Sequence, residues 1–276
     1  MAPKKDIEDL FNRVSSTYDT VGPRFFTYFG RKLVAFAGVR PGSDVLDIAT
    51  GRGAIVFAAA QAAPLKRIVG IDISEAMAVK TKKDATDNAL NNVEILCMDA
   101  ETLDFPDASF DFVFCGFALF FFPDPKAALR EIHRVLKPDG ALCVSCWTKA
   151  DERRRWLIDM VKECLPGEVD FNEALRLLPK GFDTEEQITK AMLETGFSPN
   201  KSCIETMEIC YKSAQEWWDA QYSHGIRSIF ETVEKKIGAD GLLRFKEDVF
   251  NKLNSMMENG VFIQTTKAIF VRAGKL

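Results

Sequence analysis

Apolar residues follow two alternating patterns between residues 41 and 147. Short continuous apolar runs are typical of strands buried on both faces of a sheet, whereas apolar residues recurring every three to four positions are typical of amphipathic helices. Five such runs occupy residues 44–47, 67–71, 93–97, 110–115 and 141–147. Since helical stretches separate them, the order predicts an α/β fold with a parallel sheet and right-handed crossovers.

Outside this region the pattern is mostly helical. We expect helices over residues 5–40, with an interruption at 18–23, and over 151–165, 184–195, 213–230 and 233–257. A break at 196–199 precedes a strand over about 202–210, and alternation over 261–273 predicts a last strand. We interpret the chain as one domain, with an N-terminal helical cap (1–40), a cofactor-binding core (41–147) and a C-terminal part (148–276).

The first apolar run ends on a carboxylate and turns through two glycines. The turn contains Asp47, Gly51 and Gly53 and leads into an Ala-rich helix. Glycine lacks the Cβ that would block a ligand from the backbone N–H groups at the helix start. The dinucleotide fingerprint G-x-G-x-x-G would place a third glycine at Val56, so a diphosphate is not the expected ligand. A carboxylate beside the turn instead favours an ammonium or sulfonium group.

Two further carboxylates follow the next two apolar runs. Asp72 ends the second run, and Ser74 is placed to cap the following helix. An acid at this position is where such folds bind the hydroxyl groups of a ribose. Asp99 follows the third run at the same predicted sheet edge, although an ordinary loop acid is the alternative reading.

Five segments together resemble the class I S-adenosylmethionine-dependent methyltransferases. They are D-x-A-x-G-x-G at 47–53 and, in the order of that family, the segments 69–74, 98–101, 110–115 and 134–140. Position 49 has alanine where the family motif D/E-x-G-x-G-x-G has its first glycine. In this respect the motif is similar to that of the ubiquinone/menaquinone C-methyltransferase branch. The resemblance implies a Rossmann-like seven-stranded sheet with helices on both faces. It also implies a last strand inserted antiparallel between the fifth and sixth, and a helical lid before that strand.

The resemblance implies S-adenosyl-L-methionine as cofactor and assigns contacts with it. Asp72 would bind the ribose, and Asp99, helped by the Ala100 backbone, would accept from the adenine amino group. Tyr18 would place its ring against the methionine end, near the sulfonium, unless it only packs between helices. The further cofactor contacts are assigned to Asp47, Thr50, Gly51, Gly53, Ile73, Met77, Cys115 and Phe117.

The fourth apolar run leads into an aromatic segment. Four of the six residues from Phe117 to Phe122 are phenylalanine. Ligands in open α/β sheets bind beyond the carboxyl ends of the strands, so we expect this segment at the mouth of the site. Its rings either line an apolar acceptor pocket or pack beneath the helix that starts at 124–126, and the sequence leaves both readings open.

The chain contains two histidines, His133 and His224. His133 lies in a helix expected behind the sheet and is interpreted as structural. If the acceptor must lose a proton, His224 is the candidate catalytic base, with Tyr222 as an orienting hydroxyl. A capping or surface role is the alternative for His224. A third possibility is that His224, Arg227 and Lys212 clamp an anionic acceptor such as a prenyl diphosphate or a carboxylate.

Composition excludes several classes of function. The net charge of −4 argues against a nucleic-acid partner, because no excess of basic residues is present to neutralise phosphates. No run approaches the ~20 apolar residues of a membrane span, so stable membrane insertion is not expected. Seven cysteines without a secretory segment predict reduced thiols and a cytoplasmic protein. The pair Cys143 and Cys146 would point to opposite faces of one strand, which argues against a shared metal.

The sequence therefore predicts an enzyme, a methyltransferase that moves a methyl group from S-adenosylmethionine to an apolar small molecule. The content of 22 phenylalanines favours a quinone-like, prenylated or terpenoid acceptor. The alternatives are a nicotinamide-dependent oxidoreductase, or a protein that binds S-adenosylmethionine without transferring its methyl group. The sequence does not distinguish carbon, nitrogen or oxygen as the methylated atom, and it does not indicate an oligomeric state.

Overall fold

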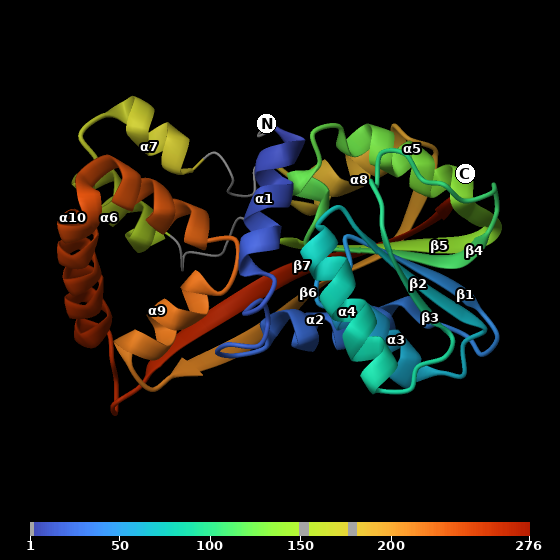
Figure 1. Ribbon diagram of the computed structural model, residues 1–276. Coiled ribbons are helices and arrows are strands. Elements are labelled where there is room, and N and C mark those ends of the chain that lie inside the picture. The colour runs from blue at the N-terminus through green and yellow to red at the C-terminus, as the bar shows by residue number, and fades with distance from the viewer. Residues whose placement is uncertain (1–2, 149–154, 176–180) are drawn as a thin grey trace.

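A seven-stranded mixed sheet forms the centre of the molecule (Figure 1), and the computed structural model describes residues 3–148, 155–175 and 181–276. The strand order is β3-β2-β1-β4-β5-β7-β6. The strands are β1 (Asp44–Ile48), β2 (Arg67–Asp72), β3 (Val93–Cys97), β4 (Phe110–Gly116), β5 (Leu136–Trp147), β6 (Phe197–Tyr211) and β7 (Phe262–Lys275). The first five are parallel, and β7 is antiparallel to both β5 and β6. The predicted α/β class and the inserted last strand are confirmed.

Helices cover both faces of this sheet (Figure 1). One face carries α2 (Phe25–Ala37), α3 (Ala54–Ala62) and α4 (Glu75–Asp87), and the other carries α5 (Pro125–Val135) and α8 (Glu185–Leu193). The helix starts follow local capping rules: Ser74 accepts from the Met77 N–H, and Asp124 accepts from the Ala127 N–H ahead of α5. Ser74 is therefore the cap that its position in the sequence predicts.

The N-terminal helix α1 (Lys4–Val14) packs on the start of α4. Its buried residues Ile7, Leu10 and Val14 recur at helical spacing and form one cluster with Met77. The Asn12 side-chain oxygen also accepts from Ser74 Oγ at 2.7 Å and from the Ala76 N–H at 3.2 Å. These contacts fix α1 beside the carboxyl ends of β1 and β2.

A second hydrophobic cluster lies beside the end of β6 and the start of β7 (Figure 1). It is formed by α6 (Arg155–Cys164), α7 (Glu168–Ala174), α9 (Ala214–Tyr222) and α10 (Arg227–Ser255), and we call these four helices the cap. Within it, the ring of Phe230 stacks on those of Trp218 and Tyr222, which are tilted by 36° to each other. The predicted helical segment before the last strand is therefore present.

Several predicted boundaries in the C-terminal part are wrong. The expected helix over 213–230 is divided at residues 223–226, and α10 continues through 231–232 to a kink at Gly238, where φ is +75°. β6 begins at Phe197 and runs through Pro199, where a break was expected. An edge strand accepts proline because its outer N–H groups need no partner, and the register shifts between Pro199 and Lys201. The part of the expected helix at 151–154 lies outside the described residues.

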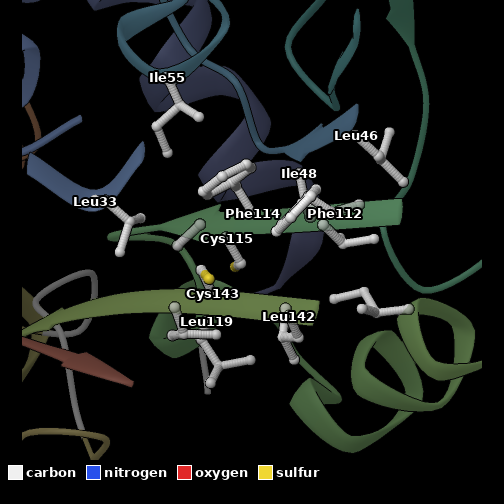
Figure 2. Close-up of a cluster of buried hydrophobic side chains, with 14 of the residues drawn as sticks. Leu33, Leu46, Ile48, Ile55, Phe112, Phe114, Cys115, Leu119, Leu142 and Cys143 are labelled. Carbon is white, nitrogen blue, oxygen red and sulfur yellow. The ribbon is translucent and has the colours of Figure 1, made fainter. Parts of the chain in front are cut away.

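The main core fills the space between the sheet and its helices. Figure 2 shows part of it, in which Phe112, Phe114 and Cys115 of β4 lie among side chains of neighbouring elements. Cys143 and Cys146 are fully buried and unpaired. Among the described residues, no group of histidine, cysteine, aspartate and glutamate side chains is arranged to hold a metal ion.

Gly30 sets the distance between α2 and α3. A Cβ at this position would lie 2.9 Å from the Ala54 carbonyl oxygen, which is backbone and cannot move aside easily. We expect Gly30→Ala to lower the free energy of unfolding by about 1–3 kcal/mol, because this overpacking outweighs the ~1 kcal/mol gain in helix propensity. Urea denaturation measures the change. The exposed Arg31→Ala is the control, and equal stability of the two variants would contradict the proposed close packing.

Candidate cofactor-binding site

Two adjoining cavities lie at the carboxyl ends of the central strands. The large cavity measures about 700 Å³ and the small cavity about 460 Å³, each including the part open to solvent. Tyr18, Ala49, Gly51, Gly116 and Phe117 line both. Because the two cavities share these residues, one elongated ligand can occupy both.

The turn after β1 forms the floor between the cavities. Gly51 and Gly53 have φ values of +54° and +77°, the left-handed conformation that glycine adopts without strain. Ala49 has φ of +54° at the place where the family pattern usually has glycine, at a cost of about 1–2 kcal/mol. The Gly51 N–H donates to Asp72 Oδ2 at 2.8 Å, which ties this turn to the end of β2.

Asp72 is buried and lines the large cavity. Its Oδ1 accepts from the Ser74 N–H at 2.8 Å, while Oδ2 accepts from Gly51. Burial raises the pKa of Asp72 to about 6, and the two backbone hydrogen bonds lower it. Each oxygen retains a second lone pair, so the carboxylate can still accept from hydroxyl groups of a ligand.

The polar end of the large cavity holds a group that the sequence analysis missed. Lys4 Nζ donates to Asp99 Oδ2 at 2.6 Å and to Glu101 Oε2 at 2.9 Å. Lys4, Ile7 and Phe11 recur at helical spacing, and all three line the cavity from α1. Ile73, Met98 and Ala100 complete this end. Lys4 lies 95 residues from Asp99, and no local pattern could have indicated their contact.

The opposite end of the large cavity is aromatic. Phe11 contacts both Phe121 and Tyr18 edge to face, with ring centroids 5.3 and 5.9 Å apart. Phe117 and Phe122 line the same end, whereas Phe120 is buried in the core. Three rings of the aromatic segment therefore line the cavity, and one packs in the core.

The small cavity contains a buried carboxylate. The side chain of Asp47 is 1% exposed, and this burial raises its pKa to about 8. Thr50 and the N–H of Val56 lie near enough to lower that pKa, but among the described residues no contact of either Asp47 oxygen has full hydrogen-bond geometry. Asp19 and Arg52 also line the cavity. A cationic group bound here would stabilise the charged form of Asp47.

Five of the predicted site residues line neither cavity. Met77 is fully buried under α1, and Cys115 is fully buried in the core, where Figure 2 shows it. Gly53 shapes the turn only. Tyr222 stacks on Phe230 within the cap, with ring centroids 5.1 Å apart. The other predicted cofactor residues all line a cavity, namely Tyr18, Asp47, Thr50, Gly51, Asp72, Ile73, Asp99, Ala100 and Phe117.

The fifth of these residues, His224, lies behind an aromatic layer. Its ring contacts Phe25 and Phe26 edge to face, with centroids 5.1 and 6.3 Å apart, and Phe26 lines the small cavity. His133 packs edge-on against Phe197, with centroids 5.2 Å apart, on the sheet face that α5 covers. This is the structural position expected for His133.

Comparisons with known proteins identify methyltransferases as relatives of this chain. The methyltransferase domain model matches residues 46–144. Aklanonic acid methyltransferase from a Streptomyces species is 41% identical over 140 residues, which are 50% of this chain and 64% of that relative, so this match spans less than two thirds of its length. Nocamycin O-methyltransferase from Saccharothrix syringae is 30% identical, with 82% of this chain and 84% of the relative aligned. The ubiquinone/menaquinone biosynthesis C-methyltransferase of Hydrogenovibrio crunogenus is 31% identical, with 70% and 82% aligned.

The residues of both cavities fit the cofactor of these enzymes. Asp72 can bind a ribose and Asp99 an adenine amino group, while the unpartnered oxygens of Asp47 suit an ammonium group. No helix in the described part of the chain is long and apolar enough to cross a bilayer. On this evidence the chain belongs to the class I S-adenosylmethionine-dependent methyltransferases.

Proposed function

We propose that this protein transfers the methyl group of S-adenosylmethionine to a neutral aromatic small molecule bound at the aromatic end of the large cavity. The observation that carries this proposal is that Tyr18 and Phe117 line both cavities. Tyr18 and Phe117 therefore lie between Asp47, which is suited to the ammonium group of the cofactor, and the rings of Phe11 and Phe121. Aromatic faces near the sulfonium would stabilise its positive charge.

The charges of the cavities support a neutral acceptor. Five carboxylates line the two cavities, namely Asp19, Asp47, Asp72, Asp99 and Glu101. The cations that line them, Lys4 and Arg52, are paired with Asp99 and Asp84. The clamp considered for an anionic acceptor is not assembled, because Arg227 pairs with Glu231 at 2.8 Å and Lys212 is exposed. An anionic acceptor would therefore meet mainly negative charge.

The named relatives support the same class of acceptor. Their names refer to aklanonic acid, nocamycin and ubiquinone or menaquinone. One is named as an O-methyltransferase and another as a C-methyltransferase, so the methylated atom is left to experiment. We also propose a cytoplasmic location, which is supported by the seven cysteines, all described and none in a disulfide.

In this proposal the chain acts mainly by positioning. Methyl transfer is an in-line displacement, in which the acceptor nucleophile, the methyl carbon and the sulfur must align. When bound, the cofactor supplies the activated methyl group. The rings of Phe11, Tyr18 and Phe121 hold the acceptor and exclude water from the junction of the cavities, while Asp47 and Asp72 hold the cofactor.

The test of this function is a screen of acceptors with isotopically labelled S-adenosylmethionine. Phenols, quinols, aromatic amines and prenyl diphosphates are incubated with the enzyme, and products are identified by mass. We expect label in neutral aromatic acceptors and none in the diphosphates. Labelling confined to anionic acceptors would contradict the proposed class. Tight cofactor binding with no labelled product from any acceptor would favour the non-transferring alternative.

The position of His224 predicts a small catalytic effect. We expect His224→Asn to lower kcat less than about tenfold, because general-base catalysis is worth 10²–10⁴-fold and this side chain lies behind Phe25 and Phe26. Tyr222→Phe should behave in the same way. The measurement is kcat and its pH profile with the acceptor found in the screen. A loss of kcat above 100-fold, together with loss of the rise in kcat at low pH that reports deprotonation of a base, would establish His224 as the catalytic base.

A further inference from the structure

Ser145 is a buried polar residue to which the fold supplies no hydrogen-bond partner among the described residues. It lies near the end of β5, in an otherwise apolar stretch, and is 1% exposed. Among the described residues, its Oγ has no hydrogen-bond partner. The side chain lines the small cavity, next to Gly116. A Cβ at Gly116 would lie 2.6 Å from Ile55 Cδ1 and 3.6 Å from Ser145 Oγ, so glycine at this position lets Ile55 pack against the strand beside Ser145.

Ser145 shares this cavity with two other polar side chains whose contacts lack full hydrogen-bond geometry. Both oxygens of Asp47 and the Thr50 Oγ1 are buried without full hydrogen bonds, and all three residues line the small cavity. A buried polar group left unpaired destabilises the folded protein. Three such groups, converging from β1, the following turn and β5, indicate that polar groups of a ligand complete them.

We propose that Ser145 binds the amino-acid end of the cofactor, together with Asp47 and Thr50. This inference deepens the proposed function, because it depends on S-adenosylmethionine occupying both cavities. A hydroxyl group both accepts and donates, so Ser145 can accept from the ammonium group or donate to the carboxylate of that end. Its effect is to fix the position of the methionine end at the junction where Tyr18 and Phe117 meet.

The test compares two ligands that differ only at this end. S-adenosylhomocysteine carries the amino-acid group, and 5′-methylthioadenosine lacks it while keeping the adenosine and a thioether. We expect Ser145→Ala to weaken binding of S-adenosylhomocysteine about 10- to 150-fold, as for loss of one hydrogen bond to a charged group, and to change binding of 5′-methylthioadenosine less than about twofold. Isothermal titration calorimetry measures both dissociation constants without turnover.

Thr148 provides a matched control within the same strand region. Its Oγ1 is also buried and without a partner among the described residues, but it lines neither cavity. Thr148→Val should therefore leave both dissociation constants unchanged. Combining Ser145→Ala with Asp47→Asn should cost less than the sum of the single effects, because both side chains bind the same end of the ligand.

Three results would overturn the assignment of Ser145. They are unchanged binding of S-adenosylhomocysteine, an equal loss for both ligands, and an equal loss in Thr148→Val. If Ser145→Ala does not fold, Ser145→Cys, which keeps the side-chain shape with a larger γ atom and weakens the hydrogen bond, is measured in its place. Failure of the wild-type protein to methylate any acceptor would count against the proposed function and would leave the Ser145 result standing.

Discussion

Replacing Asp47 with asparagine is expected to weaken binding of S-adenosylmethionine about 30- to 150-fold, which is the loss of a buried, charged hydrogen-bond partner worth about 2–3 kcal/mol. The pKa of Asp47 is raised to about 8 by burial, so its carboxyl group is protonated in the ligand-free protein at neutral pH. Binding an ammonium group stabilises the carboxylate, and a proton must leave. In the wild-type protein, cofactor affinity should therefore rise with pH up to about 8.

Calorimetry in buffers with different ionisation enthalpies measures that proton release. The wild-type protein should release protons on binding at pH 7, and Asp47→Asn should release fewer. The pH dependence of affinity should flatten in the variant. Equal proton release by the two proteins would contradict the assignment of Asp47 as the ammonium partner.

The same substitution is expected to stabilise the ligand-free protein. Between pH 4 and pH 8 the folded state keeps a proton on Asp47 that the unfolded state loses, since the pKa is 3.8 in the unfolded chain and about 8 in the folded one. This group's contribution to stability is therefore present below pH 4 and is lost as the pH rises to 8. Asn has no such dependence, so the variant should gain about 2–4 kcal/mol at pH 7 and little at pH 4. Urea denaturation at both pH values measures the difference.

Asp72→Ala is expected to weaken cofactor binding by about 1–3 kcal/mol, or about 5- to 150-fold, through loss of charge-assisted hydrogen bonds to the ribose. It also removes the acceptor of the Gly51 and Ser74 N–H groups, which shape the turn. Comparing adenosine with 2′-deoxyadenosine as competitors separates the two effects. The deoxy compound should bind more weakly to the wild-type protein, and the difference should shrink in the variant.

The control for this variant is Asp104→Ala, which removes an exposed carboxylate in the loop after β3. It should leave both competitors unchanged. Unchanged cofactor binding in Asp72→Ala would remove Asp72 from the site. An undiminished difference between adenosine and its deoxy analogue would mean that Asp72 acts on the turn alone.

The sequence predicted those parts of the site that are contiguous in the chain. Asp47, Gly51 and Gly53 form one turn, and Asp72 with Ser74 combines a strand end with a helix cap, so local chemistry was sufficient. Lys4 was missed because its partner Asp99 lies on another element, and contact between them requires the folded chain. Ser145 was missed because one hydroxyl within an apolar strand resembles ordinary core composition.

The cap was predicted less accurately than the sheet. Helical periodicity continues on both sides of Gly225, so the sequence did not show that α9 ends at Tyr222 and α10 begins at Arg227. His224 is polar and lies between aromatic residues, which is compatible with either a site or a core. Only the packing against Phe25 and Phe26 shows that it is separated from the cavities.

The position of β7 has a consequence for how the protein is made. β7 is the last strand in the chain, yet it lies between β5 and β6 and pairs with both. During synthesis, β6 therefore emerges from the ribosome long before its only partner, while the outer edge of β5 also stays open. Nascent chains would expose unpaired strand edges until β7 has been synthesised, and at this stage chaperone binding or aggregation competes with completion of the sheet.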